Sequence, residues 1–243
     1  MGVCSRSGVL TSAFSFGLPL MILSYGFGHM SGAYFNPSVT LGAVLAGEIL
    51  PIMAMLYFIM QIMGGIAAGG ILKVILRQRA YGLCQGGATL LAKYAPFNNT
   101  SGAAGIPHHY PDESVVWWEG LLIEMIVTFV FVTIFIMVAV DLKAKTGLAP
   151  LIVGFTFVAC MVSSDSLNPA RSLGPAIFAN QWDNHYVFWI GPILGAVLAG
   201  AGYRCLVQKT GFHMRQTGTW VKDIVERYKR VRITNLLSGF SEI

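Results

Sequence analysis

Two apolar segments, residues 37–47 and 169–179, constrain the fold of this chain more than any other feature. Each follows an Asn-Pro junction, at Asn36 and at Asn168. Eleven residues of helix reach about 16 Å at a rise of about 1.5 Å per residue, while the hydrocarbon core of a bilayer is about 30 Å thick. Each segment is therefore apolar enough for a membrane but too short to cross one.

These two segments repeat one another. Aligned on the asparagines, NPSVTLGAVLA matches NPARSLGPAIFA at the Asn, the Pro and the Leu-Gly pair. Asn is a favoured N-cap, and Pro fits the first helical position, where its missing amide hydrogen costs nothing. The pattern predicts two half-helices, which start at Pro37 and Ser38 and at Pro169 and Ala170. Paired interrupted segments in the two halves of a membrane chain are typical of an inverted repeat around a central site.

The rest of the chain has a membrane composition, with 55% hydrophobic and 11% charged residues, against roughly 25% charged in soluble domains. Five further apolar runs approach or exceed the ~20 residues that a helix needs to cross hydrocarbon. They are residues 9–27, 50–75, 116–140, 148–164 and 185–206, of which the fourth is the shortest. The predicted fold is an all-α membrane protein, an inverted repeat with five full transmembrane helices and two re-entrant half-helices.

Half-helices that enter from opposite faces would bring their N-termini together near the middle of the membrane. In lipid, a broken helix is tolerated only where it is buried in protein or lines a wet cavity. The side-chain amides of Asn36 and Asn168 can donate hydrogen bonds to a neutral molecule, while the positive helix ends repel cations and protons. Arg171 adds a fixed positive charge near these helix ends. The alternative is that its side chain extends to the membrane interface and has no part in the pore. The pattern favours a passive pore for small uncharged molecules.

Glu124 is the other costly charge, because it lies inside the third full span. We expect it to be protonated or hydrogen-bonded to loop backbone, so that it holds a re-entrant segment in place. The alternative is that Glu124 carries protons, although no second carboxylate in another predicted span could take part.

Other functional classes find little support. The four cysteines, Cys4, Cys84, Cys160 and Cys205, show no paired spacing, so neither a disulfide framework nor a metal site is predicted. No nucleophile-base pair, metal cluster or phosphate-binding loop indicates an enzyme, and no cofactor is expected. The net charge of +5 comes mainly from one tail beside apolar spans, which suits anionic lipid rather than nucleic acid.

The long connection 76–114 and the tail 208–243 set the orientation. Ten Lys and Arg fall on the side of the tail and five on the other side, which puts the C-terminus in the cytoplasm. Two overlapping sequons, at Asn98 and Asn99, then lie outside the cell, where glycosylation occurs. The basic tail is either an amphipathic helix on the membrane surface or a solvated extension.

At these residues the chain closely resembles the aquaporin family, also called major intrinsic proteins. SGAYFNPSVTLG and SLNPARSLGPA look like its two signature loops, WIGPILGAVLAG looks like its last helix, and the likeness covers about 9–207. The resemblance implies a homotetramer of separately conducting subunits, each with six helices and two half-helices. The first of those six helices has no counterpart here, so residues 1–207 are expected to form a channel domain without it.

The resemblance also implies roles for single residues. Asn36 and Asn168 match the central asparagines of the pore, and Arg171 matches the selectivity arginine near the outer mouth. Phe16 matches the aromatic side chain of the same constriction. Met161 stands where the family has a histidine, and it cannot donate a comparable hydrogen bond.

Further matches concern the support of the pore. His29 matches a loop histidine that packs behind the first half-helix, and Glu124 matches a buried glutamate of the family. Ser38 replaces the usual Ala. Ser172 stands where glycerol-conducting members have Asp, so the resemblance favours water, and the Phe188-Trp189 pair also looks water-type.

The sequence thus predicts a passive water channel in the plasma membrane that excludes protons and ions, with water and lipid as its partners. Two alternatives stay open. Met161 and the short stretch before Asn168 would suit a pore for glycerol or another small solute. The lack of the first helix would suit a non-conducting subunit that modulates full-length relatives.

Overall fold

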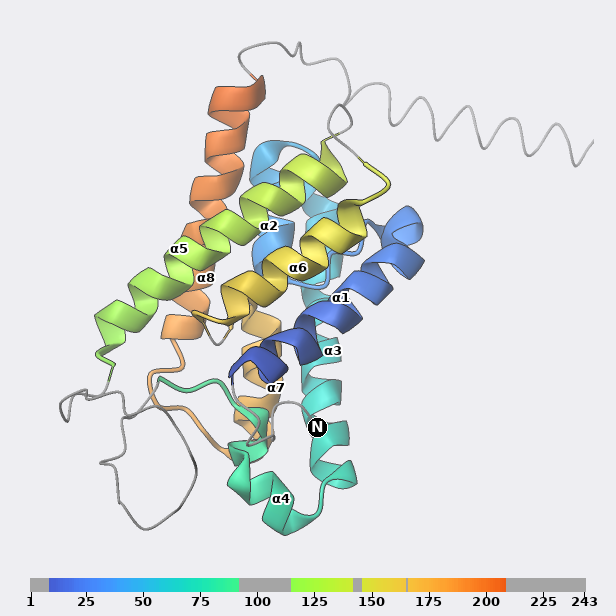
Figure 1. Cartoon of the computed structure of the whole chain (residues 1–243). Coiled ribbons are helices and arrows are strands. Elements are labelled where there is room, and N and C mark those ends of the chain that lie inside the picture. The colour runs from blue at the N-terminus through green and yellow to red at the C-terminus, as the bar shows by residue number, and fades with distance from the viewer. Residues whose placement is uncertain (1–8, 92–114, 142–145, 165, 209–243) are drawn as a thin grey trace, which may run out of the picture. The chain divides into compact units, whose positions relative to one another are not determined.

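The computed structural model describes residues 9–91, 115–141, 146–164 and 166–208 (Figure 1). The sequons at Asn98 and Asn99 lie outside these residues, as does all of the predicted tail helix. Residues 1–203 form one compact unit, and the second unit, 204–243, is described only as far as residue 208.

The described part of the chain is helical and contains no strand. Four helices are long and apolar enough to cross a membrane: α1 (Val9–Ser31), α3 (Pro51–Ile75), α5 (Trp117–Phe135, extended by the π-helical turn η3, Ile136–Val140) and α8 (Val187–Gly202, extended by the π-helical turn η4, Tyr203–Gln208). The fifth expected span is α6 (Ala149–Met161), which has only 13 residues. Two short elements, α4 (Gln78–Leu83) and the 3-10 turn η2 (Gln85–Gly87), follow α3. The predicted all-α membrane fold is confirmed, but four of the five expected spans are long enough to cross a membrane, because α6 is shorter than predicted.

Both half-helices are present where the sequence places them. They are α2 (Pro37–Ala46) and α7 (Pro169–Ala179), with Asn36 and Asn168 as their N-caps. α2 ends at Gly47, which has a φ of 83°, and this left-handed conformation turns the chain away without a steric cost for Gly.

Helix pairing repeats across the unit. α3 packs along α7, and α8 packs along α2 in the same way, while α1 and α6 pack against each other (Figure 1). The elements α1, α2 and α3 therefore correspond to α6, α7 and α8, as expected for an inverted repeat. The remaining helix, α5, covers α8, and no described helix covers α3 in the corresponding way.

Glycines allow the half-helices to lie against the long helices. A Cβ atom added to Gly65 of α3 would collide with the carbonyl group of Ala170, and one added to Gly174 of α7 would collide with the carbonyl oxygen of Gly65. In the other half, a Cβ atom at Gly200 of α8 would collide with the carbonyl oxygen of Gly42. Small residues at helix contacts are common in membrane proteins, because they let backbones approach closely.

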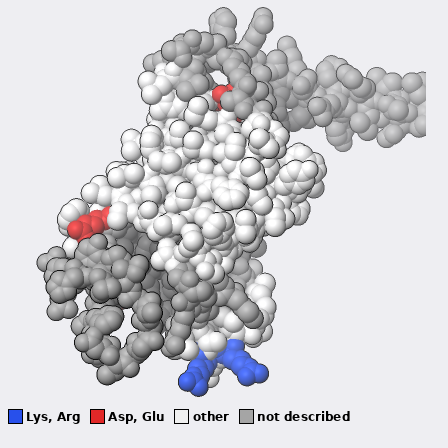
Figure 2. Space-filling view, in the orientation of Figure 1, with Lys and Arg blue, Asp and Glu red and all other residues white. Residues whose placement is uncertain are grey.

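The outer surface matches a lipid environment. Many large apolar side chains of the long helices are exposed. The described residues on the face in Figure 2 are mostly white, with Lys and Arg at the lower end and acidic residues at the left edge and near the top. The interior holds an aromatic cluster, in which the Phe131 ring lies 5.2 Å from Phe157 and 6.3 Å from Phe135 between centroids.

We predict that Gly65→Val disrupts the unit, because its side chain meets the backbone of Ala170, which cannot move aside. The expected loss is about 3 kcal/mol of stability or more, as for a strongly overpacked core. Thermal unfolding of the detergent-solubilised protein measures it. Gly64→Val is the matched control, since no described atom beyond its own helix lies within 4 Å of that position. Equal melting temperatures for the two variants would contradict the packing of α3 on α7.

Candidate functional site

The N-termini of the two half-helices meet through a pair of crossed hydrogen bonds. Asn36 Nδ2 donates to the carbonyl oxygen of Leu167 at 2.8 Å, and Asn168 Nδ2 donates to the carbonyl oxygen of Phe35 at 3.1 Å. Each asparagine therefore binds the residue that precedes the opposite asparagine. The juxtaposition of residues 36 and 168, on which the pore interpretation depends, is present.

The same asparagines cap their own half-helices. Asn36 Oδ1 accepts from the amide of Ser38 at 2.8 Å, and Asn168 Oδ1 accepts from the amides of Ala170 at 3.0 Å and Arg171 at 3.2 Å. Because Oδ1 of each asparagine accepts the capping bonds, Nδ2 faces the opposite loop. An amide nitrogen has two protons, and the crossed bond uses one. The second proton can donate to an oxygen atom of a molecule at the junction.

Two positive helix ends lie at this junction. The first amides of a helix have no intrahelical acceptor, and the macrodipole places about half a positive charge there. Pro37 and Pro169, at the first helical positions, remove one amide from each set. A cation at the junction would therefore face two positive helix ends.

Glu124 holds the backbone that leads into α7. Its two carboxylate oxygens accept from the amides of Ser166 and Leu167, both at 2.9 Å, and from Ser164 Oγ at 2.7 Å. Leu167 needs this support, because its φ of 56° is in the left-handed region that a branched residue rarely adopts. The Glu124 side chain is only 2% exposed, so these hydrogen bonds are buried.

The corresponding loop before α2 is held by an amide instead of a carboxylate. Gln61 Nε2 donates to the carbonyl oxygen of Tyr34 and, at 2.8 Å, to Thr40 Oγ1. Tyr57 Oη donates to the carbonyl oxygen of Ser31 at 2.8 Å. Our sequence reasoning missed Gln61, although a Gln in the middle of an apolar span is a visible signal.

Arg171 and Phe16 lie together as predicted for a constriction. The guanidinium carbon is 4.7 Å from the centre of the Phe16 ring, and Arg171 Nη1 donates to the carbonyl oxygen of Gly87 at 3.3 Å. Met161, at the end of α6, is buried in the apolar cluster against which Phe16 also packs. Arg171 is therefore held inside the unit by an aromatic face and a backbone carbonyl. Gly87 was not found from the sequence.

Two serines of the half-helices are buried. Ser172 Oγ lies 2.5 Å from Ser166 Oγ, so this hydroxyl is used in packing α7 against its own loop. Ser38 is fully buried in α2.

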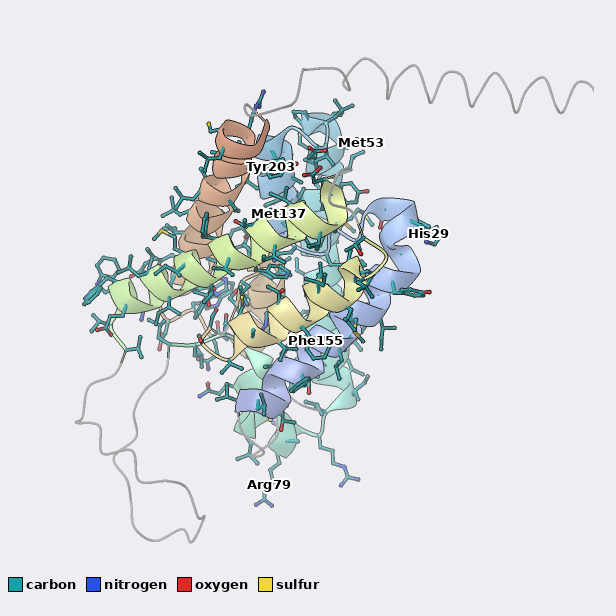
Figure 3. All side chains as sticks on the ribbon, turned by 45° about the horizontal axis from the view of Figure 1, so that its top comes forward. His29, Met53, Arg79, Met137, Phe155 and Tyr203 are labelled. Carbon is teal, nitrogen blue, oxygen red and sulfur yellow. The ribbon has the colours of Figure 1, made fainter. Side chains whose placement is uncertain are left out.

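His29 does not lie where the resemblance implies. It occupies the last turn of α1 and is exposed, pointing away from the helices in Figure 3. The expectation that it packs behind α2 is wrong, because α1 continues as a helix to Ser31 and thereby turns this side chain outward.

The cysteine prediction also needs correction. Cys84, between α4 and η2, is disulfide-bonded, whereas Cys160 and Cys205 are free. Spacing along the chain did not indicate this bridge. Among the described residues, no group of three or more His, Cys, Asp or Glu could hold a metal ion.

His185 precedes α8 and is linked to it. Trp189 Nε1 donates to His185 Nε2 at 3.0 Å, and the imidazole packs edge-on against Trp182. Burial lowers the pKa of His185 below its ordinary value of 6.5, since it disfavours the charged ring.

The sequence of this chain is similar to those of known proteins. The family model described as "Major intrinsic protein" matches residues 2–203. Mouse aquaporin-8 is 31% identical over 207 residues, which cover 83% of this chain and 72% of that protein. Aquaporin Z of Photorhabdus laumondii is 34% identical over 208 residues, covering 82% and 83%.

A longer relative and a solved structure also match. The Drosophila melanogaster neurogenic protein big brain is 32% identical over 210 residues, 86% of this chain, although the match spans only 27% of that protein. The X-ray structure of the aquaglyceroporin from Plasmodium falciparum superposes with a TM-score of 0.60 at 17% identity, covering 85% of this chain and 86% of that one. At that identity the structural likeness supports the fold alone.

We predict that Glu124→Gln destabilises the unit by about 2–3 kcal/mol, because an amide supplies one acceptor where two backbone amides need one each. Denaturant unfolding in detergent measures the loss. Ser164→Ala is the matched control, since it removes a donor to the same carboxylate but leaves both backbone amides paired. A loss as large in the control would show that the loop amides do not depend on Glu124.

We predict that acid weakens the contact between His185 and α8. The folded pKa lies below the unfolded value, so the folded state binds fewer protons; the contribution is complete above pH 6.5 and falls as the pH drops below it. Melting temperatures between pH 8 and 5 measure this. His185→Gln keeps an acceptor for Trp189 but does not titrate, so its acid loss should be smaller; equal losses would contradict this role of His185.

Proposed function

This chain belongs to the major intrinsic protein family, and from that premise we propose that its two half-helices form the selective part of a water channel. Family membership and the long apolar helices show that it is a multi-pass membrane protein. The family is one of transport channels for water or small solutes, not of enzymes. The selectivity for water is the proposal.

The crossed bonds between Asn36 and Asn168 and the opposite loops are the observation that carries the proposal. They fix two amide donors at one junction, each with a proton left for an oxygen atom of a permeating molecule. A water molecule that accepts from both donors must turn its own protons away from the junction. This orientation interrupts a chain of water hydrogen bonds at the point where proton transfer has to be stopped.

Charge exclusion has two sources in this arrangement. The helix ends at Pro37 and Pro169 repel cations at the junction, and Arg171 repels them at the constriction. Because the Phe16 ring lies against the guanidinium, the charge sits on a narrow, partly apolar wall. Water passes such a wall at a lower cost than a hydrated ion, which would have to lose its shell.

A pore for glycerol or another small solute is the second candidate, and Met161 favours it. Met161 puts a thioether, which offers no hydrogen-bond donor, where the resemblance implies a histidine, although the structure buries it in the apolar cluster against which Phe16 also packs. Against this, Ser172 is turned into the packing behind α7, so it adds no polar group to widen or line the constriction.

The proposal extends to assembly and placement. We propose a homotetramer in the plasma membrane with the C-terminus in the cytoplasm, in which each subunit conducts by itself. The exposed apolar face of α3 would also suit the alternative role, a non-conducting subunit that modulates other members of the family. Osmotic tests on this chain alone and on a co-reconstituted relative separate these readings.

We predict that the purified protein raises the osmotic water permeability of lipid vesicles, measured by stopped-flow light scattering. Asn168→Asp should lower that permeability about tenfold, equivalent to about 1.4 kcal/mol on the barrier, because a carboxylate cannot donate to Phe35 and places a negative charge at the junction. Asn180→Asp is the matched control at the other end of α7, where Oδ1 can still accept from Trp182.

The same assay decides between the candidates. Water permeability equal to that of protein-free vesicles would refute the water channel, provided that the protein is inserted. Glycerol uptake at a rate similar to water uptake would favour the second candidate.

A further inference from the structure

The end of α3 and the short helix α4 together form a charged surface at the edge of the membrane. α3 ends at Ile75, and Leu76 and Arg77 then leave the helical conformation, with ψ values of 134° and 143°. Only 6% of the residues in the apolar stretch of α3 are buried, so almost the whole helix faces the surroundings of the protein. A span that ends at Ile75 places Arg77 at the depth of the lipid headgroups, just outside the hydrocarbon.

This surface carries positive charge without a neighbouring carboxylate. Lys73, Arg77 and Arg79 lie here, and the sequence has no acidic residue from 49 to 111. Lys73 Nζ donates to the carbonyl oxygen of Phe178 at 3.2 Å and lies 5.9 Å from the centre of its ring, so this cation is held by the end of α7. Arg77 and Arg79 are exposed and form no ion pair with any residue that the structure describes. Arg79 points away from the helices in Figure 3.

Exposed apolar side chains lie beside the two arginines. Arg79 and Leu83 are four residues apart in α4 and therefore share one face of the helix. Leu83 is 78% exposed, and Val74 and Ile75 at the end of α3 are 86% and 69% exposed. Water disfavours such apolar surface, whereas lipid acyl chains cover it. The surface thus joins guanidinium groups to apolar side chains, as the boundary between headgroup and acyl chain does in a phospholipid.

The other side of α4 is fixed on the protein. Tyr81 lies against Gly86 of η2, where an added Cβ atom would collide with the Tyr81 side chain. The amide of Tyr81 donates to the carbonyl oxygen of Arg77 at 2.9 Å, so the start of α4 is hydrogen-bonded. Because Tyr81 anchors α4 on η2, the face with Arg79 and Leu83 is left exposed.

We propose that this surface binds an anionic phospholipid. The headgroup phosphate lies between Arg77 and Arg79, and an acyl chain lies along Val74, Ile75 and Leu83. Each guanidinium can donate two parallel N–H bonds to phosphate oxygens. A headgroup with its own ammonium group would meet two positive charges and no carboxylate, so a headgroup with a net negative charge fits this surface better.

Native mass spectrometry of the full chain, delipidated in detergent and titrated with phosphatidylglycerol, tests the proposal. Arg77→Gln and Arg79→Gln should each weaken phosphatidylglycerol binding about fivefold, the effect of one basic residue near an anionic surface. Lys73→Gln is the matched control, because it removes one charge at the same place but from a side chain that binds Phe178; its effect should be less than about twofold. All variants keep the basic residues after 208, so lipid bound there cancels in the comparison.

Two further measurements separate the lipid from its phosphate. Leu83→Ser should also weaken phosphatidylglycerol binding, because it removes an acyl contact, and inorganic phosphate should not displace the lipid. Displacement by phosphate together with unchanged binding by Leu83→Ser would show a site for phosphate alone and overturn the inference. Equal binding by the two arginine variants and the Lys73→Gln control would overturn it as well.

A photoreactive acyl chain on phosphatidylglycerol gives a readout on the unmodified protein, in case a variant fails to fold. Peptide mapping after illumination should find the label on residues 74–83. A label confined to residues after 208 would contradict the proposed site.

Discussion

The crossed pair of hydrogen bonds between two half-helices is the interaction on which the rest of this structure depends. Each half-helix begins at this junction inside the helical unit, where unpaired backbone groups are costly because they have lost contact with water. Asn36 and Asn168 resolve this for both segments at once, since each side chain caps its own helix and binds the opposite loop. The long helices then have a fixed centre against which to pack.

Support for this centre differs between the two halves. Behind α7, Glu124 pairs two consecutive loop amides and so stabilises a left-handed Leu167. Behind α2, Gln61 of α3 binds the loop carbonyl of Tyr34 instead. The repeat is thus symmetric at the junction and asymmetric behind it. A carboxylate fits where donors converge, and an amide fits where carbonyl and hydroxyl oxygens converge, because the polarity of the loop atoms differs on the two sides.

In the proposed channel, permeation and folding stability depend on the same groups. The side-chain amides of Asn36 and Asn168 bind the two halves together and are also the donors at the junction. Arg171, which would exclude cations, is held by the carbonyl group of Gly87. A substitution at the junction therefore changes folding and permeation together. Separating the two effects requires control variants outside the junction, such as those at Asn180 and Ser164.

Sequence alone determined the features that depend on local hydrogen bonding and on length. The Asn-Pro starts of α2 and α7 and their short reach follow from capping and helical rise, and both appear in the structure. Four of the five expected apolar spans are long enough to cross a membrane, and α6 is shorter than expected. The pairing of Phe16 with Arg171 came from the family resemblance. The hydrogen bonds of Glu124 to loop backbone could be predicted, because a carboxylate in an apolar span needs hydrogen-bond donors.

Only the tertiary structure decided which atoms meet across the chain. Leu167 is 131 residues from Asn36, and Gly87 is 84 residues from Arg171, so no local pattern could assign either carbonyl. His29 was misplaced because the end of α1 at Ser31, not the identity of the residue, sets the direction of its side chain. The disulfide of Cys84 and the hydrogen bonds of Gln61 likewise depend on how the folded chain packs. Local order is fixed by bonds within about four residues, whereas the partners of a carbonyl or a thiol are fixed by helices that touch only after the chain has folded.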